Sequence, residues 1–346
     1  MGRRTSGTAP TLSEVARHAG VSLATASRAI NGSSTRVVGE ELRGRVLESA
    51  RVLGYAPDAN AQAMATGTTR AVGVVVHDLT DPYFAAIADG MSRAAADRQL
   101  FLTLATTGNR LDQLADVVGS LDSLRVRAMV LVGARWKDSD VKDALRVSVA
   151  RYLDRGGRVV AIGMEFPGVD CVRVDNVQGA RDLADRLVSL GYRRPVVLTG
   201  PERHSTAASR SDAFAARMAE LGHPVPDDHL ISSDFTRTGG TVGMRLALEA
   251  RLDADVVVAM NDVMALGAMN QARASGVRIP NELAFAGFGD IATLEDVVPG
   301  LTTVRVPMAE LGALAVGLAT DGPGDGSGTV TVPVSVVVRG STPRRT

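Results

Sequence analysis

Apolar and polar positions near the start of the chain alternate with the period of an α-helix. Residues 12–19 place their apolar side chains at i, i+3, i+4 and i+7, on one face of a predicted short helix: Leu12, Val15, Ala16 and Ala19. Thr11 and Glu14 have the spacing of a capping box, in which a hydroxyl and a carboxylate satisfy free backbone N–H groups. Gly20 provides the left-handed residue that a tight turn needs, and Ser22 can cap a second helix.

Two further helices are predicted after this turn, with Val21 filling the angle between the first and the second. The second helix directs Ala26, Ala29 and Ile30 inward, and its outer surface is of a kind that enters a major groove: Leu23, Ala24, Thr25, Ser27 and Arg28. A third helix over residues 41–53 has its inward positions at Leu42, Val46, Leu47, Ala50 and Leu53. The pattern is typical of a DNA-binding helix-turn-helix, and a purely structural pair of helices is the alternative.

From residue 71 onward, short β-rich runs alternate with helical stretches. Seven of these runs are strongly apolar and are predicted strands: 71–76, 100–105, 128–133, 158–163, 194–200, 255–260 and 283–288. Continuous apolar strands that alternate with helices indicate parallel sheets covered on both faces. This number of strands favours two doubly wound lobes over one. The Gly- and Asp-rich segment 321–328 indicates a surface loop.

Composition adds a charge asymmetry to this picture. The 346 residues are 45% hydrophobic, enough for more than one core, and the formal net charge is zero. Residues 1–70, however, contain nine Arg against five acidic residues, a balance of +4. A basic N-terminal unit on a mildly acidic body suits a protein whose N-terminal unit meets DNA phosphates. Part of the excess reflects a general use of Arg, because Lys occurs only at positions 137 and 142.

Several function classes lack their motifs in this chain. Neither lysine follows a glycine, so no GxxxxGK[ST] phosphate loop exists, and the five histidines form no HExxH motif. A GxSxG elbow is also missing, so we expect no enzyme activity, no metal and no cofactor. Cys171 is the single cysteine and is expected to be a buried small apolar residue. The lack of a signal-like segment and of a long apolar run predicts a cytoplasmic protein.

Segments along the whole chain, in the right order, resemble the LacI/GalR family of bacterial transcription regulators. They are VARHAGVS, TASRAING and RVLESARVLGYAPDANAQAMA near the N-terminus, AVGVVVHDLTDPYFAAIADGM at 71–91, VDNVQGARDLADRLVSLGY at 174–192, MNDVMALGAMNQA at 260–272 and LAFAGFGDIATLEDVVPGLTTVRVP at 283–307. The resemblance implies an all-α headpiece at residues 1–56, a hinge helix or linker at 57–70 and a periplasmic-binding-protein-like body at 71–340.

The resemblance also implies how the body divides into two lobes. The N-terminal lobe is expected to cover about 71–172 and 304–330, and the C-terminal lobe about 173–303 and 331–340, with VTVPVSVVVR as its last strand. Three crossings between the lobes would then form a hinge around a cleft. Because ligands of open α/β sheets bind beyond the carboxyl ends of the strands, an effector is expected in that cleft.

Recognition helices place their N-terminal side chains against base edges, so Leu23 and Ala24 occupy the positions that usually discriminate between bases. Both are apolar and can contact a thymine methyl group but cannot form a hydrogen bond. Arg28 is therefore the first candidate for a base contact, and a phosphate contact is the open alternative. Three polar residues are expected to position phosphates: Thr25, Ser27 and Asn31.

The hinge segment supplies further candidates for DNA contact: Tyr55, Asn60 and Met64. Residues 57–66 show no helical stripe and should be disordered in isolation. In the family this stretch folds on DNA and inserts an apolar side chain into the minor groove. The resemblance places Met64 at that wedge, where a leucine is usual, and a linker methionine without DNA contact is the alternative.

Effector-binding residues are implied by the same resemblance: Asp78, Phe84, Arg210, Phe235, Asn261 and Asp290. A guanidinium at Arg210 suits two adjacent hydroxyls or a carboxylate, and Phe235 aligns with an aromatic that stacks on a sugar ring. Asn261 follows a predicted strand, and Asp262 is expected to cap the next helix. Structural alternatives are an interlobe salt bridge for Arg210, a cap for Asn261, a core position for Phe235 and a turn for Asp78.

Two carboxylates common in relatives are replaced by glycine, at Gly163 and Gly289, which leaves Asp290 one place later. A site that keeps its arginine and loses carboxylates suits an anionic ligand by charge balance. The GFGD variant also resembles the gluconate-regulator branch of the family. A sugar acid is therefore the preferred effector, and a neutral sugar is second.

The sequence as a whole predicts a homodimeric transcriptional regulator that reads a near-palindromic double-stranded operator and does not bind a membrane. We expect a repressor of a carbohydrate-utilisation operon, in which the effector changes operator affinity through linkage between the two sites. The alternative is a cytoplasmic carbohydrate-binding protein or an enzyme on the same two-lobed fold.

Overall fold

The computed structural model describes residues 10–31, 38–56, 67–108, 110–133, 139–163, 165–202, 204–322, 326 and 328–345. The chain forms two compact units, Met1–Thr69 and Arg70–Thr346, which we call the headpiece and the body. The headpiece buries its own small apolar cluster, separate from the two larger clusters of the body.

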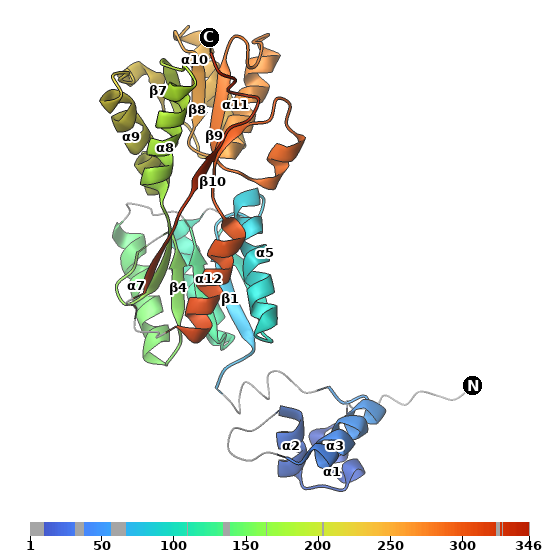
Figure 1. Cartoon of the computed structure of the whole chain (residues 1–346). Coiled ribbons are helices and arrows are strands. Elements are labelled where there is room, and N and C mark those ends of the chain that lie inside the picture. Colours follow the sequence, from blue (N-terminus) through green and yellow to red (C-terminus); the bar gives the residue numbers. More distant parts are fainter. Residues whose placement is uncertain are drawn as a thin grey trace, which may run out of the picture. The chain divides into compact units, whose positions relative to one another are not determined.

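The described part of the headpiece consists of α1 (Leu12–Ala19), α2 (Leu23–Asn31) and α3 (Glu40–Leu53) (Figure 1). The capping box is confirmed, because Thr11 N–H donates to Glu14 Oε2 at 2.7 Å and Glu14 N–H donates to Thr11 Oγ1 at 3.3 Å. Gly20 has a φ of +65° and ends α1 in the left-handed conformation. Ser22 Oγ accepts the N–H of Thr25 at 3.1 Å, so the second predicted cap also forms.

The headpiece core is rich in alanine and consists of Val15, Ala16, Ala19, Ala26, Ala29, Val46 and Ala50. The prediction for the third helix is partly wrong, because Leu42 and Leu47 are 38% and 44% exposed whereas Ser49 is buried. The Ser49 hydroxyl donates to the carbonyl of Arg45 at 2.8 Å, which satisfies it within the helix. The core residues that α1 and α2 contribute are mostly alanine, so α3 packs against them through a narrow face. Leu42 and Leu47 lie outside this face.

The first lobe of the body contains, in the described residues, a six-stranded sheet in the order β11-β5-β4-β3-β1-β2. All its pairings are parallel, and its strands are β1 (Ala71–Val76), β2 (Phe101–Thr106), β3 (Ala128–Val132), β4 (Val159–Ile162), β5 (Asp170–Val174) and β11 (Thr329–Val332). Alternate residues of β1 enter different apolar clusters, so both faces of the sheet are buried.

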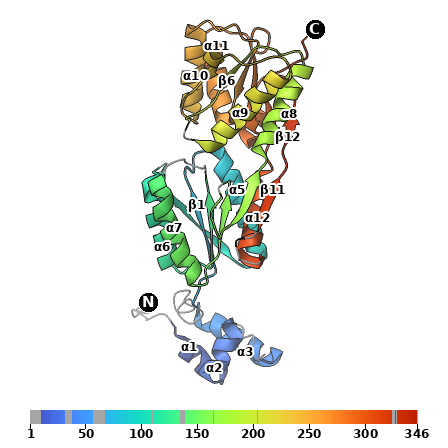
Figure 2. The same ribbon diagram turned by 90° about the vertical axis from the view of Figure 1, so that its left-hand side faces the viewer.

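Helices cover the two faces of this sheet. α5 (Pro82–Asp97) packs against α12 (Met308–Asp321) on one face, and α6 (Leu114–Ser123) packs against α7 (Ser139–Asp154) on the other (Figure 2). A short 3-10 helix, η1 (Leu111–Gln113), precedes α6. The arrangement is the doubly wound sheet that the alternation of apolar runs predicts.

The second lobe contains a second sheet, six-stranded over the same described residues, in the order β12-β10-β9-β8-β6-β7. Its strands are β6 (Pro195–Leu198), β7 (Leu230–Ile231), β8 (Val256–Ala259), β9 (Ala284–Gly289), β10 (Thr302–Arg305) and β12 (Ser335–Val337), and only the β10–β12 pairing among those described is antiparallel.

Two helix pairs lie on opposite sides of the second sheet (Figure 2). One pair is α8 (Asn176–Ser189) with α9 (Ser205–Glu220), and the other is α10 (Arg237–Glu249) with α11 (Asp262–Ala274). Two 3-10 helices, η2 (Asp227–His229) and η3 (Ala292–Asp296), lie in its loops. Helices on both sides of each parallel sheet confirm the predicted fold class.

The chain passes between the lobes after β5, after β10 and after β11, three times in the described residues. The second and third crossings lie at 306–307 and 333–334, a few residues beyond the expected boundaries. The run VTVPVSVVVR is not one strand of the second lobe, because β11 joins the first sheet and β12 joins the second. Pro333 stands between them, where the chain changes lobe and where its missing N–H interrupts no ladder.

Each of the seven predicted apolar runs overlaps a strand, and Cys171 in β5 is buried as expected. Among the described residues, no helix is long and apolar enough to cross a bilayer.

Candidate functional site

Arg210 is the most deeply buried cation among the described residues of the body, with 4% of its surface exposed. Its Nε donates to Asn176 Oδ1 at 2.8 Å, and its Nη1 donates to the carbonyl of Met260 at 2.7 Å. The guanidinium lies over the ring of Phe288, 3.8 Å from the centroid. Burial lowers the pKa of Arg210 to about 10, and among the described residues its Nη2 has no hydrogen-bond partner.

The partners of Arg210 come from different elements of the second lobe. Asn176 is the first residue of α8, Met260 follows β8, and Phe288 belongs to β9. Met260 and Phe288 lie at the carboxyl ends of neighbouring parallel strands, the edge where open α/β sheets bind ligands. The fold therefore fixes a buried guanidinium at the place where a ligand is expected.

The first lobe brings polar groups toward this arginine from the start of α5. Asp81 caps α5, its Oδ1 accepting the N–H of Tyr83 at 2.9 Å, and burial raises the pKa of both Asp81 and Tyr83. Both groups act electrostatically on Arg210 and oppose the fall of its pKa. We call Asp81, Tyr83, His204, Arg210, Phe235 and Asn261 the interlobe site.

His204 and Phe235 form an aromatic pair beside Arg210. Their ring centroids are 4.4 Å apart with the planes tilted by 34°. His204 caps α9, its Nδ1 accepting the N–H of Ala207 at 3.2 Å, so the neutral ring carries its proton on Nε2. Burial and the charge of Arg210 lower the pKa of His204 to about 4. At neutral pH the pair therefore presents an uncharged, largely apolar surface.

Asn261 caps α11 with its side chain, since Oδ1 accepts the N–H of Met264 at 2.8 Å. Its Nδ2 donates to the carbonyl of Phe235 at 3.1 Å and so holds the loop that carries the aromatic ring. The expectation that Asp262 would cap this helix is wrong. Asp262 is instead buried below β9, where Thr303 Oγ1 and the N–H of Ile291 donate to its carboxylate.

Asp262 also explains the glycine at position 289. Gly289 has a φ of +145°, and a Cβ there would lie 2.8 Å from Asp262 Oδ2. Burial raises the pKa of Asp262 to about 6, because its hydrogen bonds only partly offset the loss of water. The carboxylate of Asp262, in α11, therefore occupies the space that a side chain at position 289 would take. At Gly163, with a φ of +79°, the nearest atom to such a Cβ is Gly133 O at 3.4 Å.

The remaining predicted effector residues are placed differently. Phe84 packs edge-on against Tyr83 and His77, with centroid distances of 5.4 and 6.2 Å, close to the interlobe site. Asp78 Oδ1 accepts the N–H and the hydroxyl of Thr80, as a turn residue does. The carboxylate of Asp290 accepts a hydrogen bond from Arg305 and forms an ion pair with Arg339. Asp290 is not among the described acidic groups that act on Arg210.

In the headpiece, the predicted recognition helix is α2. Leu23 at its start is 52% exposed, and Ala24 is also exposed. The Thr25 hydroxyl lies 2.8 Å from that of Ser22. Ser27 and Arg28 are half-buried, and Asn31 is the last residue of α2. Tyr55 packs against the headpiece core. Asn60 and Met64 lie outside the described residues.

Comparison with known proteins gives both units the same assignment. A family described as periplasmic binding proteins and sugar binding domain of LacI family matches residues 69–319, and one described as bacterial regulatory proteins, lacI family, matches residues 11–58. The chain belongs to the LacI family. Its resemblance to that family, drawn from separate sequence segments, is confirmed.

Relatives of this LacI-family chain are transcriptional regulators and not enzymes. GalS of Salmonella typhimurium, an HTH-type transcriptional regulator, is 31% identical over 90% of this chain and 89% of its own length. The structure of the CelR–cellobiose complex has a TM-score of 0.69 at 28% identity, covering 96% of this chain and 99% of CelR. The Lac repressor dimer bound to operator and ONPF has a TM-score of 0.83 at 22% identity, over 97% and 100%, and shows the fold.

Sequence reasoning missed several residues in and around the interlobe site of this LacI-family body: His77, Asp81, Tyr83, Asn176, His204 and Phe288. His77 directly follows the apolar run 71–76, so the rule that ligands lie beyond strand ends could have singled it out. His204 follows the apolar run 194–200 less closely, after the intervening residues 201–203, so the same rule points to it less directly. Within the described residues, no group of His, Cys, Asp and Glu is arranged to hold a metal ion.

Proposed function

We propose that this LacI-family protein is a dimeric repressor of a carbohydrate-utilisation operon, whose affinity for a near-palindromic operator is controlled by a small sugar or sugar acid. The observation that carries the effector proposal is the burial of Arg210 with an Nη2 that no described residue engages. Nη2 is not among the fully enclosed polar atoms of the described residues, so a ligand oxygen can reach it and accept a charge-assisted hydrogen bond. The headpiece, a helix-turn-helix of the family type, supports the DNA proposal.

The chemistry of the interlobe site supports a polyhydroxylated ligand. The guanidinium of Arg210 offers planar donors, and the stacked rings of His204 and Phe235 offer an apolar surface for the C–H face of a sugar ring. The related regulator CelR has been solved with cellobiose. A comparable ligand class is therefore what we propose for this chain.

Charge balance separates the two effector classes. No carboxylate of the described residues forms an ion pair with Arg210, and burial raises the pKa of Asp81, the acidic group that faces Arg210 from the other lobe. A ligand carboxylate would neutralise the buried guanidinium directly. We therefore favour a sugar acid, with a neutral sugar as the second choice.

The proposed mechanism is linkage between effector and operator. A homodimer presents two headpieces to two half-sites, which is why the operator is expected to be nearly palindromic. Ligand that binds one arrangement of the lobes more tightly than another shifts the population of that arrangement. Because linkage is reciprocal, an effector that weakens operator binding must itself bind the operator complex more weakly.

A thermal-shift screen of the full chain tests the effector proposal. Sugar acids are compared with neutral sugars of the same carbon skeleton, for example gluconate with glucose, because a ligand that binds the folded state raises its stability. We expect a shift with one sugar-acid or sugar class. Operator sequences come from selection of bound duplexes from a random DNA pool, titrated with and without the hit.

Arg210→Gln is the decisive variant for the site. It removes the guanidinium, so we expect the ligand-induced thermal shift to be lost and operator binding without ligand to persist. Arg217→Gln, on the same helix but at the surface with Asp185 and Glu220, is the matched control and should respond to ligand like the wild type. An unchanged shift in folded Arg210→Gln would contradict the proposed site.

A further inference from the structure

Asp290 lies in the turn between β9 and η3 and takes the left-handed conformation, with a φ of +62°. Its carboxylate pairs with two arginines at once, through a hydrogen bond from Arg305 and an ion pair with Arg339. Arg305 Nε lies 2.6 Å from Oδ2, and Arg339 Nη2 lies 2.7 Å from Oδ1. Only 9% of the Asp290 side chain is exposed, so water competes little for these charged contacts.

The two arginines lie in segments that adjoin different interlobe crossings. Arg305 is the last residue of β10, directly before the second crossing. Arg339 follows β12, the strand that begins after the third crossing. Arg339 is itself fixed, because its Nη1 donates to the carbonyl of Leu301 and its backbone N–H donates to Thr302 Oγ1, at 2.9 and 2.8 Å. One carboxylate thus joins the two second-lobe segments that adjoin the second and third crossings.

The turn that carries Asp290 also touches the interlobe site. Asp262, next to the cap residue Asn261, accepts backbone N–H groups of Asp290 and Ile291 and the hydroxyl of Thr303 in β10. The carbonyl of Gly289 in turn accepts the N–H of Val306 within the second crossing, at 3.0 Å. A continuous set of hydrogen bonds therefore links the start of α11 to the crossing segments.

We propose that Asp290, Arg305 and Arg339 form a hinge clamp, which makes the second and third crossings move together and sets the angle between the lobes. Asp290 is then a positioning residue and not the ligand contact that its place in the sequence indicates. The clamp concerns the body alone, so it stands or falls independently of the operator and effector proposed above.

The variant for testing the clamp in the full chain is Asp290→Asn. Asparagine keeps the size of the side chain and tolerates the left-handed backbone better than most residues, so the fold should persist. It loses the charge, and its amide NH2 faces an arginine in place of an oxygen. Contacts between charged groups stabilise the segments that they join. We therefore expect amide hydrogen exchange of β10 and β12 to be at least about tenfold faster in Asp290→Asn than in the wild type.

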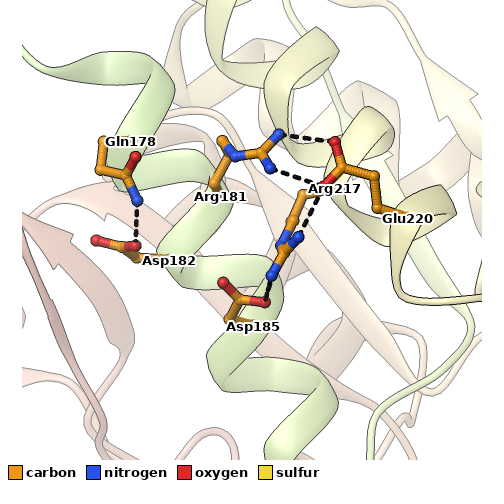
Figure 3. A network of polar contacts seen from close by, with 6 residues as sticks. All are labelled: Gln178, Arg181, Asp182, Asp185, Arg217 and Glu220. Carbon is orange, nitrogen blue, oxygen red and sulfur yellow. Dashed lines mark hydrogen bonds and ion pairs between the residues drawn. The ribbon is translucent and has the colours of Figure 1, made fainter.

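Glu220→Gln is the matched control, because Glu220 also binds two arginines, Arg181 and Arg217, on the helices α8 and α9 (Figure 3). Those residues all lie on helices of the second lobe, outside the second and third crossings. The control should leave hydrogen exchange of β10 and β12 unchanged. Acceleration there of similar size in both variants would overturn the proposal.

A second measurement reports on the hinge and not merely on a lost ion pair. Spin labels at Val147→Cys in α7 and Leu246→Cys in α10, both exposed positions, report the distance between the lobes by double electron–electron resonance. Cys171 is buried and should remain unlabelled. We expect Asp290→Asn and Arg305→Gln each to broaden or shift the distance distribution, with no further change in the double variant.

An interlobe distance distribution that is the same in Asp290→Asn as in the wild type would overturn the clamp, even if hydrogen exchange increased locally. Additive changes in the double variant would also overturn it, because they would show that Asp290 and Arg305 act separately. A changed distribution in Glu220→Gln would show that any ion pair of the second lobe has this effect and would likewise overturn it.

Discussion

At the residue scale, the interlobe site is defined by charges and rings that are buried together. Arg210 has lost its water and has gained hydrogen bonds to an amide and a carbonyl oxygen but no bonded carboxylate from the described residues. His204 beside it remains neutral because burial and the nearby guanidinium both disfavour its charged form. The burial of these groups therefore makes the interlobe site sensitive to acid.

His204 predicts a specific loss of stability at low pH. Its pKa is lowered from 6.5 to about 4 in the folded state, so below pH 6.5 the unfolded chain binds a proton that the folded chain does not. Stability is fully present above that pH and is lost as the pH falls toward 4. Linkage gives a loss of about 2 kcal/mol from His204 between pH 7 and pH 5.

Urea unfolding at the two pH values measures this loss. His204→Asn keeps a side chain that caps helices well and removes the titrating ring, so the variant should lose about 2 kcal/mol less than the wild type on acidification. His223→Asn, in the loop after α9, serves as the histidine control. An equal pH response of His204→Asn and the wild type would show that this histidine is not held neutral by the fold.

At the element scale, strongly apolar runs and helix caps were predictable because they depend on neighbours in the sequence. Thr11 with Glu14, Gly20 and Ser22 act within a few residues of one another, and the structure has all of them as expected. The division of 330–339 into β11 and β12 was not predictable in this way. Both halves are equally apolar, and only their tertiary partners, β5 and β10, decide to which lobe each belongs.

The same limit applies to the candidate site. Arg210, Phe235 and Asn261 were found through the family resemblance, but their partners come from distant segments such as 81–83 and 176. Asp290 shows the converse case. Its place after β9 indicated a ligand contact, whereas the arginines that engage its carboxylate are 15 residues away at Arg305 and farther on at Arg339. Such pairings depend on topology and not on local pattern.

The capping box allows a prediction for α1 alone. Thr11→Ala removes the acceptor for the N–H of Glu14 and should destabilise α1 by about 1 kcal/mol, which accelerates amide exchange of residues 12–19 about fivefold. Hydrogen exchange of the full chain measures this directly. Ser13→Ala, at an exposed position of the same helix, is the control and should change exchange little. Equal acceleration in both variants would mean that the cap contributes nothing specific.

At the scale of the whole molecule, the LacI-family chain combines a headpiece and a body that each have their own core. Operator recognition and effector recognition can therefore be damaged separately by mutation. If the two are linked as proposed, the separation should hold for binding and fail only for the response of one site to the other.

Arg28→Ala tests this separation from the DNA side. We expect the operator affinity to fall by about 1–3 kcal/mol if Arg28 contacts a base, while the ligand-induced thermal shift stays as in the wild type. Arg28→Lys keeps the charge but not the two-pronged geometry, so it should restore binding only if the contact is to phosphate. Loss of ligand binding in folded Arg28→Ala would contradict independent sites.

Because the two lobes are interwoven, the order in which the chain is synthesised affects when each lobe can finish folding. The first lobe takes α12 as the cover of one face and β11 as the edge strand beside β5, both from the last part of the sequence. During synthesis, therefore, the sheet that starts at residue 71 must wait, with one apolar face only partly covered by α5, until residues 308–332 have left the ribosome. By then the second lobe lacks only β12, so the two lobes complete their folding almost together, although the first is begun long before.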